Sequence, residues 1–186
     1  EFLSAQVKDV EVSRADLLGL IDELTVQMRD IFIERFQQIN RYYGEVFAEL
    51  FGGGKGELIL TDPDDILRSG IEMRAQPPGK KILNLEVLSG GEKALAAIAL
   101  LFAILKVTPS PFCVLDEIEA ALDDVNVARY AQYLRRMTDH TQFIVITHRR
   151  GTMEAADVLY GVTMQEDGVS KILRLDLDKV SADLIT

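Results

Sequence analysis

The sequence has little of three things that mark whole classes of proteins: cysteine, basic residues and long apolar runs. Its 186 residues include one cysteine, Cys113, which excludes an intrachain disulfide and a zinc cluster of several thiolates. Lys and Arg number 20 against 30 Asp and Glu, a formal net charge of −10, so bulk attraction to nucleic acid is not expected. No apolar run reaches the roughly 18 residues that a membrane span needs.

The start and the length of the chain narrow the class further. Residues 1–4, EFLS, lack the basic start and the apolar block of a signal peptide, so we expect a reducing, cytoplasmic setting and no membrane partner. At about 150 residues per domain, the length predicts one domain, or one domain with an appendage. The apolar fraction of 48% and the charged fraction of 27% are ordinary for a globular protein with a core of its own.

A long helix is predicted at the N-terminal end of the chain, in residues 1–50. Residues 13–50 contain no proline and two glycines, and their apolar residues recur at heptad spacing before the pattern slips by one residue. At 1.5 Å per residue, a helix over these residues would be about 57 Å long. It either lies along its own domain or is the stub of a coiled coil, and the heptads favour the stub. The heptad positions are Leu17, Ile21, Leu24, Met28 and Ile31, continued by Phe32, Phe36, Ile39, Tyr43, Val46 and Leu50.

Residues 51–180 predict a compact α/β domain, followed by a tail over 181–186. Short apolar runs bounded by turn residues alternate with helical patterns, which favours a parallel sheet covered by helices. The runs at 112–115 and 143–146 are apolar throughout and predict strands buried on both faces. The other strands are expected at 57–60, 70–75, 158–164 and 171–177, the last pair turning near Asp167 and Gly168, and the helices at 89–106 and 126–137.

Two glycine-rich segments invite comparison with phosphate-binding loops. Residues 52–55, GGGK, follow a helix and precede a strand, and no Ser or Thr follows the lysine, so the segment is interpreted as a helix stop rather than a P-loop. Ser89, Gly90 and Gly91 instead stand at the start of a buried helix, whose free N–H groups attract an anion such as a terminal phosphate. Ser89 as a simple N-cap explains the same residues equally well.

Polar residues follow two apolar strands. Asp116 and Glu117 come directly after residues 112–115, at the end of a strand where open α/β sheets bind ligands. Such a pair suits magnesium binding through water by Asp116 and activation of a water molecule by Glu117. His148 follows the strand at 143–146 and is suited to contact a phosphate oxygen or to position water. Asp123 either caps the next helix or contacts another subunit.

Three segments together resemble the C-terminal half of the head of SMC ATPases, the structural-maintenance-of-chromosomes family. They are 88–95 (LSGGEKAL), 114–123 (VLDEIEAALD) and 146–154 (ITHRRGTME), and their order and spacing agree with the family over nearly the whole chain. Residues 76–81 (QPPGKK) resemble the bacterial branch. The resemblance implies the C-terminal lobe of an ABC-type P-loop NTPase head, preceded by a long coiled-coil helix.

The resemblance also implies roles for the glycine-rich segment. Ser89, Gly90, Gly91 and Glu92 would form the signature motif, which in this family contacts the terminal phosphate of ATP held by the opposing head. The family's P-loop lies far upstream in the full-length protein and is absent from these residues. The chain would therefore be half of an active site, inactive alone, with ATP and Mg²⁺ as cofactors.

The remaining candidates receive roles in the same way. Asp116 would be the Walker B aspartate, Glu117 the general base and His148 the switch histidine. Leu122 and Asp123 would belong to the D-loop at the contact between heads. The implied partners are the N-terminal half of the same head, a second SMC head, and DNA through the whole nucleoid-associated complex rather than through this acidic chain.

Two other readings stay open. In the SMC family the C-terminal lobe receives the C-terminal winged-helix domain of the kleisin subunit, so the chain is also a candidate platform that needs no nucleotide, with strands 158–164 and 171–177 as the contact. A second coiled-coil ABC ATPase of DNA repair, of the RecN type, shares the motifs. Residues 147–154 favour the SMC family.

Overall fold

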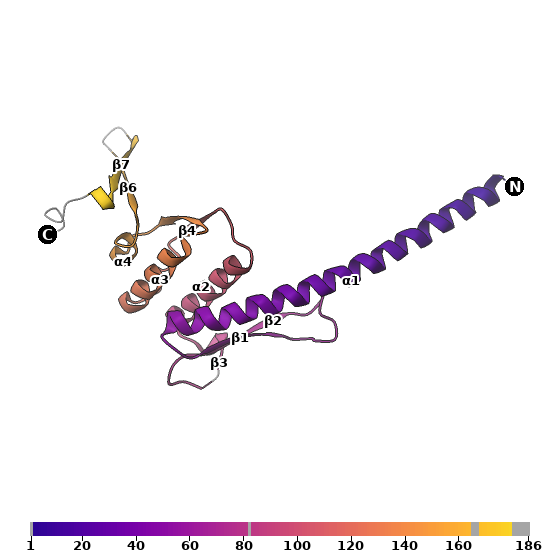
Figure 1. The fold of residues 1–186 in the computed structure, drawn as a ribbon, viewed down its shortest axis with the longest axis horizontal. Helices are drawn as coiled ribbons and strands as arrows, with labels where there is room; N and C mark the ends of the chain where they lie inside the picture. The colour runs from indigo at the N-terminus through magenta and orange to yellow at the C-terminus, as the bar shows by residue number, and fades with distance from the viewer. Residues whose placement is uncertain (1, 82, 165–167, 180–186) are drawn as a thin grey trace.

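The computed structural model describes residues 2–81, 83–164 and 168–179, which form a helical arm and an α/β globular part (Figure 1). Helix α1, Phe2–Phe51, is 50 residues long and begins well before the predicted residue 13. Figure 1 shows its N-terminal part projecting with no other element beside it. An apolar stripe on a lone helix needs a cover, so this exposure suits a coiled-coil strand without its partner, and the coiled coil stays a prediction. The exposed heptad positions are Leu17, Ile21, Leu24, Met28 and Ile31.

The second half of α1 belongs to the core. Tyr43, Val46 and Leu50 are buried, as the shifted apolar pattern predicts. The ring of Phe47 stacks on that of Phe51 with centroids 4.0 Å apart. The N-terminal part of this continuous helix is thus an exposed arm, and its C-terminal part is a core helix. The heptad pattern slips between the two parts, at Ile31 and Phe32.

Glycines end α1, as the sequence predicts. The N–H of Gly53 donates to the carbonyl of Ala48 at 2.6 Å, and Gly52 and Gly54 adopt φ values of 71° and 86°. These are left-handed conformations in which glycine ends helices. A Cβ atom on Gly54 would lie 2.2 Å from the carbonyl oxygen of Gln76, so only glycine lets the two backbones pass so closely.

Three antiparallel strands lie against α1. They are β1 (Lys55–Leu60), β2 (Ile71–Gln76) and the short β3 (Leu83–Asn84) in the order β1-β2-β3. The Asn40 side chain of α1 fixes β1, because it accepts from the N–H of Leu58 at 2.7 Å and donates to the carbonyl of the same residue at 3.1 Å. The strands predicted at 57–60 and 70–75 correspond to β1 and β2, whereas their antiparallel pairing and the short β3 are not predicted.

Helices α2 (Gly90–Val107) and α3 (Asp124–Met137) complete the core. Phe102 of α2 is fully buried and stacks on Tyr130 and Tyr133 of α3, with ring centroids 6.0 and 5.1 Å apart. Burial raises the pKa of the Tyr133 phenol to about 12, so the ring stays neutral in the core. The shorter elements are η1 (Leu85–Val87), α4 (Arg150–Met153) and η2 (Leu177–Lys179).

Two parallel strands carry the candidate site. Strand β4 (Phe112–Asp116) pairs with β5 (Gln142–Ile146), and Val114 stands opposite Ile144. On one face Leu115 is buried, and Cys113, Phe143 and Val145 pack against the same core.

The other face of this sheet is bare, so the prediction that both strands are buried on both faces is wrong for this chain. Phe112, Val114, Ile144 and Ile146 are each about half exposed. Alternate residues of a strand point to one face, and the register places all four side chains on the same one. The parallel sheet has two strands in the described residues, and helices cover one side of it.

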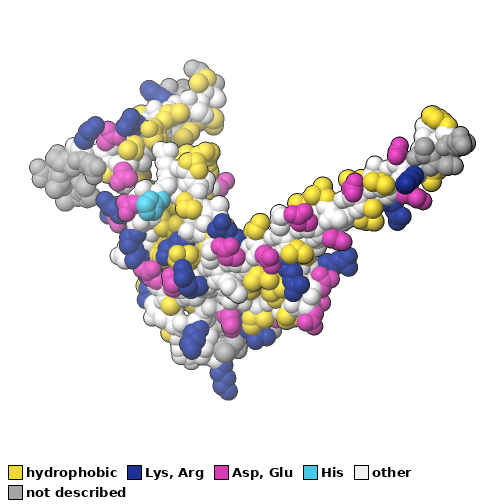
Figure 2. Space-filling model, turned by 45° about the vertical axis from the view of Figure 1, so that its right-hand side comes forward, with side chains coloured by type: hydrophobic (Ala, Val, Ile, Leu, Met, Phe, Trp, Pro, Cys, Tyr) yellow, Lys and Arg dark blue, Asp and Glu magenta, His cyan; other side chains and the backbone are white. Residues whose placement is uncertain are grey.

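A separate hairpin follows. Strands β6 (Val158–Met164) and β7 (Ser170–Asp176) pair antiparallel, close to the predicted ranges. Apolar side chains of both strands are exposed, and Figure 2 shows them gathered over the hairpin. Gly168 has a φ of 72°, whereas the predicted turn residue Asp167 and the tail over 181–186 lie outside the described residues. Among the helices that the structure describes, none is long and apolar enough to cross a membrane.

Candidate functional site

The acid pair lies at the carboxyl end of β4. Asp116 is its last residue, and Glu117 leaves the sheet with a φ of 47°, a left-handed conformation that costs a non-glycine residue about 1–2 kcal/mol. The N–H of Glu117 donates to the carbonyl of Ile146 at 2.9 Å and thereby ties the turn to β5. Residues held in this conformation cluster at functional sites.

His148 joins the acid pair. Strands β4 and β5 are parallel neighbours, so their carboxyl ends meet at one edge of the sheet. The Nδ1 atom of His148 lies 3.4 Å from Oε1 of Glu117, and both side chains are more than half exposed. The structure therefore brings together an acid and an imidazole that the sequence places 31 positions apart. Both side chains are thus accessible from solvent at this edge.

The glycine-rich segment opens α2. The hydroxyl of Ser89 accepts from the N–H of Glu92 at 3.4 Å, and the Glu92 carboxylate accepts from the N–H of Ser89 at 3.0 Å and from its hydroxyl at 2.9 Å. This reciprocal capping box confirms the N-cap role of Ser89. The Lys80 ammonium donates to Glu92 at 2.8 Å; this bond and that from the Ser89 backbone lower the pKa of the Glu92 carboxyl.

The two glycines face different surroundings. A Cβ atom on Gly90 would meet no heavy atom within 4 Å, so the backbone there is open to a ligand. A Cβ atom on Gly91 would lie 3.0 Å from the carbonyl oxygen of Ala121, so glycine lets α2 approach the loop that follows Glu117.

The two D-loop candidates have structural roles. The Asp123 carboxylate accepts from the N–H of Asn126 at 2.8 Å and caps α3, which confirms one of its two predicted roles. Leu122 is buried, and its N–H donates to the carbonyl of Glu119 at 3.0 Å. A contact of either residue with another subunit stays a prediction.

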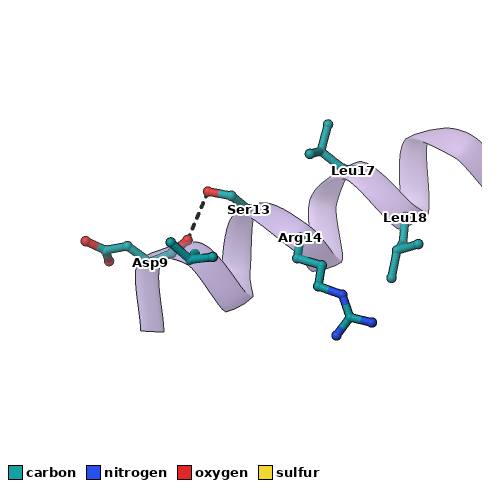
Figure 3. Close-up of a pocket in the computed structure, with 6 residues that line it drawn as sticks. Asp9, Ser13, Arg14, Leu17 and Leu18 are labelled. Carbon is teal, nitrogen blue, oxygen red and sulfur yellow. Dashed lines mark hydrogen bonds between the residues drawn. The ribbon is translucent and has the colours of Figure 1, made fainter. Parts of the chain in front are cut away.

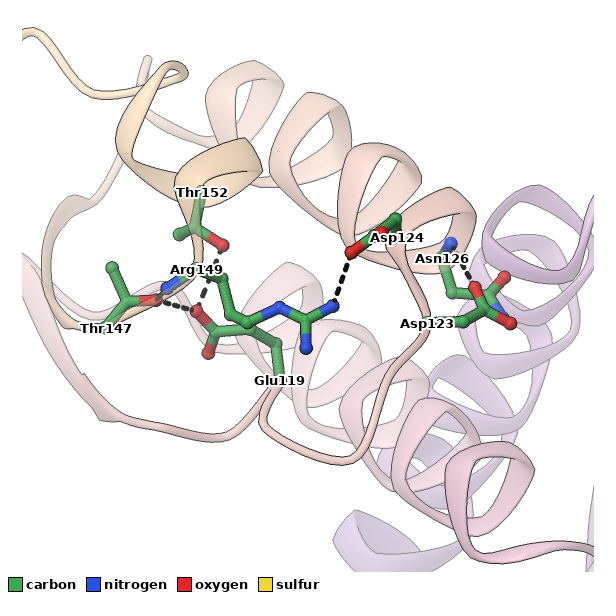
Figure 4. Close-up of polar contacts among 7 residues, drawn as sticks. All are labelled: Glu119, Asp123, Asp124, Asn126, Thr147, Arg149 and Thr152. Atoms are coloured by element: carbon green, nitrogen blue, oxygen red, sulfur yellow. Dashed lines mark hydrogen bonds and ion pairs between the residues drawn. The ribbon is translucent and has the colours of Figure 1, made fainter.

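Sequence reasoning missed Glu119. This carboxylate is fully buried and accepts from the hydroxyls of Thr147 and Thr152, at 2.5 and 3.0 Å (Figure 4). Arg149 lies beside it and pairs with Asp124 at 2.8 Å. The sequence does hold one clue to it: Glu119 is the third acidic residue in the stretch 116–119 and directly follows the apolar Ile118.

A magnesium ion at this edge would find one protein ligand of the right kind. Asp116 offers a carboxylate at the strand end, and across the described ranges no three His, Cys, Asp or Glu side chains converge on a metal position. That donor set fits Mg²⁺, which keeps most of its water shell and takes one or two carboxylates together with substrate phosphates.

A second surface feature lies far from this edge. Figure 3 shows a shallow hollow on the exposed part of α1, where the Ser13 hydroxyl donates to the carbonyl of Asp9 at 2.9 Å. One helix alone lines it, so it belongs to the apolar stripe of the arm. Its lining residues are Asp9, Val10, Ser13, Arg14, Leu17 and Leu18.

Comparison with known proteins identifies the family. The family model described as "RecF/RecN/SMC N terminal domain" matches residues 5–171, and the chain belongs to that family. The chromosome partition protein Smc of Bacillus subtilis is 59% identical over 179 residues, which are 96% of this chain and 15% of that protein. The chain thus spans about 15% of the length of this relative.

Solved structures place the fold among SMC head domains. A chain from a study of ATP-driven dimerisation and DNA-stimulated activation of SMC ATPases is 45% identical with a TM-score of 0.74, covering 81% of this chain and 91% of that one. The Smc head of Pyrococcus furiosus, with an extended coiled coil and bound to the C-terminal domain of ScpA, is 42% identical with a TM-score of 0.80, covering 95% of this chain and 44% of that one.

Proposed function

We propose that this chain is the C-terminal half of an SMC ATPase head, which acts in chromosome partition. The observation that carries the proposal is the pairing of Glu117 with His148 at the carboxyl edge of two parallel strands, beside Asp116. The matching family model is named for an N-terminal domain, and the proposal departs from that name. It rests on the absence of Gly-x-x-x-x-Gly-Lys-Ser/Thr from residues 1–186 and on the three motifs that are present.

The proposed chemistry is hydrolysis of ATP. Glu117 accepts a proton from the attacking water, and His148 helps to hold that water or a phosphate oxygen. Asp116 would hold Mg²⁺ through the water shell of the ion, and the bound ion would supply neutralisation of the phosphate charge. Gly90 and Gly91 present backbone N–H groups to the terminal phosphate of ATP bound to a second head. The Ser89 hydroxyl must leave Glu92 to join them, and Lys80 stays within reach of the released carboxylate.

The bare face of the β4–β5 sheet supports a missing half. Four apolar side chains of one sheet face stand in solvent, and such patches mark interaction surfaces. A segment that carries the P-loop would cover them and add strands to the same sheet. The RecN-type alternative would require the same cover, and the identity to Smc over 96% of the chain favours the SMC reading.

Binding of the P-loop segment is testable by a substitution at Val114, one of the four exposed apolar residues of the β4–β5 sheet. Val114→Asp is expected to weaken binding of the separately produced P-loop half at least about 100-fold, because the new carboxylate would be buried without a partner. Ile71→Asp, at an equally exposed position of β2, is the matched control and is expected to bind normally. Co-purification and calorimetry measure both, and equal binding by the two variants would count against the half-head.

A second proposed function is a docking platform for a kleisin. The observation that favours it is the β6–β7 hairpin, whose residues Val162, Met164 and Ile172 are about two-thirds exposed. The related Pyrococcus furiosus head was solved with the C-terminal domain of ScpA bound. Calorimetry with a kleisin winged-helix domain tests it: nucleotide-free binding is expected to fall at least tenfold in Val162→Asp and to persist in Ile71→Asp. Binding unchanged by Val162→Asp would exclude the hairpin.

A further inference from the structure

Glu119 is an acidic side chain with no access to solvent. Its Oε1 atom accepts from the hydroxyls of Thr147 and Thr152, and its Oε2 atom has no hydrogen-bond partner among the described residues. Burying a carboxylate costs free energy, and its hydrogen bonds make the surrounding segments rigid. Here the two donors are Thr147, directly before His148, and Thr152, in α4.

Further contacts tie down the residues on both sides of His148. The Thr147 hydroxyl accepts from the N–H of Arg149 at 3.0 Å, and the guanidinium of Arg149 pairs with Asp124 at the start of α3. Figure 4 shows the Glu119 carboxylate pointing toward the hydroxyls of Thr147 and Thr152, with the Arg149 side chain beside it. The imidazole of His148 is itself exposed and contacts Glu117. Its neighbours are therefore fixed, whereas its ring is free to meet a ligand.

The backbone on the acid side is fixed as well. The N–H of Ala120 donates to the carbonyl of Glu117, and that of Leu122 donates to the carbonyl of Glu119, each at 3.0 Å. The loop from Glu117 to Leu122 is thus a set of tight turns, and the Glu119 side chain is its link to the segment that follows β5. An apolar side chain of equal size would leave the buried Thr152 hydroxyl and the half-buried Thr147 hydroxyl without this acceptor.

We propose that Glu119 is a positioning residue for the reaction: it sets the distance between the general base Glu117 and His148 by clamping Thr147 and Thr152 to the loop after β4. The inference rests on the proposed ATPase function and deepens it. Displacements of about 1 Å at reacting groups cost up to about 100-fold in rate. The clamp therefore acts on turnover, whereas nucleotide affinity depends on other groups.

The test uses matched threonine variants of the full-length protein. Thr152→Val removes one hydroxyl donated to Glu119 and keeps the shape, and Thr152→Ser restores the hydroxyl. Thr141→Val is the control, because the hydroxyl of Thr141 is equally buried but donates to the carbonyl of Ser110, at the far end of β5. We expect kcat for ATP to fall about tenfold in Thr152→Val, with KM within about twofold, and to recover in Thr152→Ser. Thr141→Val is expected to keep the wild-type kcat.

Substitutions of Glu119 itself give the larger effect. Glu119→Leu is expected to lower kcat about 10- to 100-fold. Glu119→Gln is expected to lower it less, because the amide oxygen still accepts both hydrogen bonds while the NH2 group at the Oε2 position lacks an acceptor among the described residues. Hydrogen exchange supplies a readout without nucleotide. Peptides over 143–153 are expected to exchange faster in Thr152→Val than in Thr141→Val, while peptides over 43–51 stay unchanged.

The outcomes separate this inference from the function beneath it. If Glu117→Gln abolishes hydrolysis while Glu119→Leu and Thr152→Val keep the kcat of Thr141→Val, the positioning role is overturned and the ATPase proposal stands. If the wild type and Glu117→Gln hydrolyse ATP equally, the ATPase proposal fails. The exchange of peptides 143–153 then decides the clamp alone, and equal exchange in the two threonine variants overturns it.

Discussion

Replacing Glu117 by Gln in the completed head is expected to abolish turnover while ATP still binds. The amide keeps the size of the side chain and the left-handed backbone at φ 47°, but it cannot accept a proton from water. General-base catalysis contributes about 100- to 10,000-fold, so kcat is expected to fall at least about 100-fold. Steady-state phosphate release measures kcat, and equilibrium binding of a labelled ATP analogue measures affinity.

A neutral change elsewhere controls for the loss of one charge. Glu57→Gln removes an exposed carboxylate from β1, on a different sheet from Glu117, and is expected to leave kcat unchanged. Hydrolysis by Glu117→Gln at the rate of Glu57→Gln would refute the general-base role. Because His148 contacts Glu117, a partial loss in His148→Ala with full ATP binding would be consistent with the pair acting together.

Ser89→Arg is expected to prevent ATP-driven pairing of two completed heads while each head still binds ATP. The surface at Ser89 and Gly90 is open, and a guanidinium there would occupy the space into which a terminal phosphate and the opposing head must come. Pairing measured by sedimentation with ATP, in the Glu117→Gln background, is expected to disappear. The proposal places the P-loop on the other half of each head, so affinity for ATP is expected to stay within about threefold of the parent.

The substitution also removes a helix cap, so a second variant is needed. Ser89→Ala loses the same capping hydroxyl, which costs about 1 kcal/mol, but adds no bulk. It is expected to unfold at the temperature of Ser89→Arg and to retain most of the pairing. Pairing by Ser89→Arg equal to that of Ser89→Ala would show that this surface does not face a second head.

The sequence predicts the elements of this chain better than their surroundings. The helix stop at Gly52, the Ser89 cap and the acids at the end of β4 follow from local chemistry, which a single chain carries complete. The burial of β4 and β5 does not follow from local chemistry. Their apolar residues on both faces predict two covered faces, and one face is bare. The apolar pattern of a strand reflects its burial in the complete assembly. The exposure of one apolar face in this chain therefore supports a second segment that covers this face in the complete protein.

The residues of the candidate site also differ in how far the sequence predicts them. Glu117 and His148 are predictable one by one, because each follows an apolar strand, and the parallel pairing of those strands brings them together. Glu119 is not predictable, because its partners Thr147 and Thr152 lie 28 and 33 residues away and only the fold places them against it. Strands β1 and β2 are predicted, but β3 and the antiparallel pairing are not, because a two-residue strand carries no periodicity of its own and strand pairing is set by the fold.

Magnesium-dependent ATP hydrolysis is the sharpest test of whether this chain is half of a split ATPase site. The chain is assayed alone and then mixed with the separately produced half that carries the P-loop, with folding of both confirmed by circular dichroism. We expect no hydrolysis by the chain alone, and hydrolysis in the mixture that is lost with Glu117→Gln. Hydrolysis by the chain alone, or none in a mixture of two folded and bound halves, would contradict this proposal.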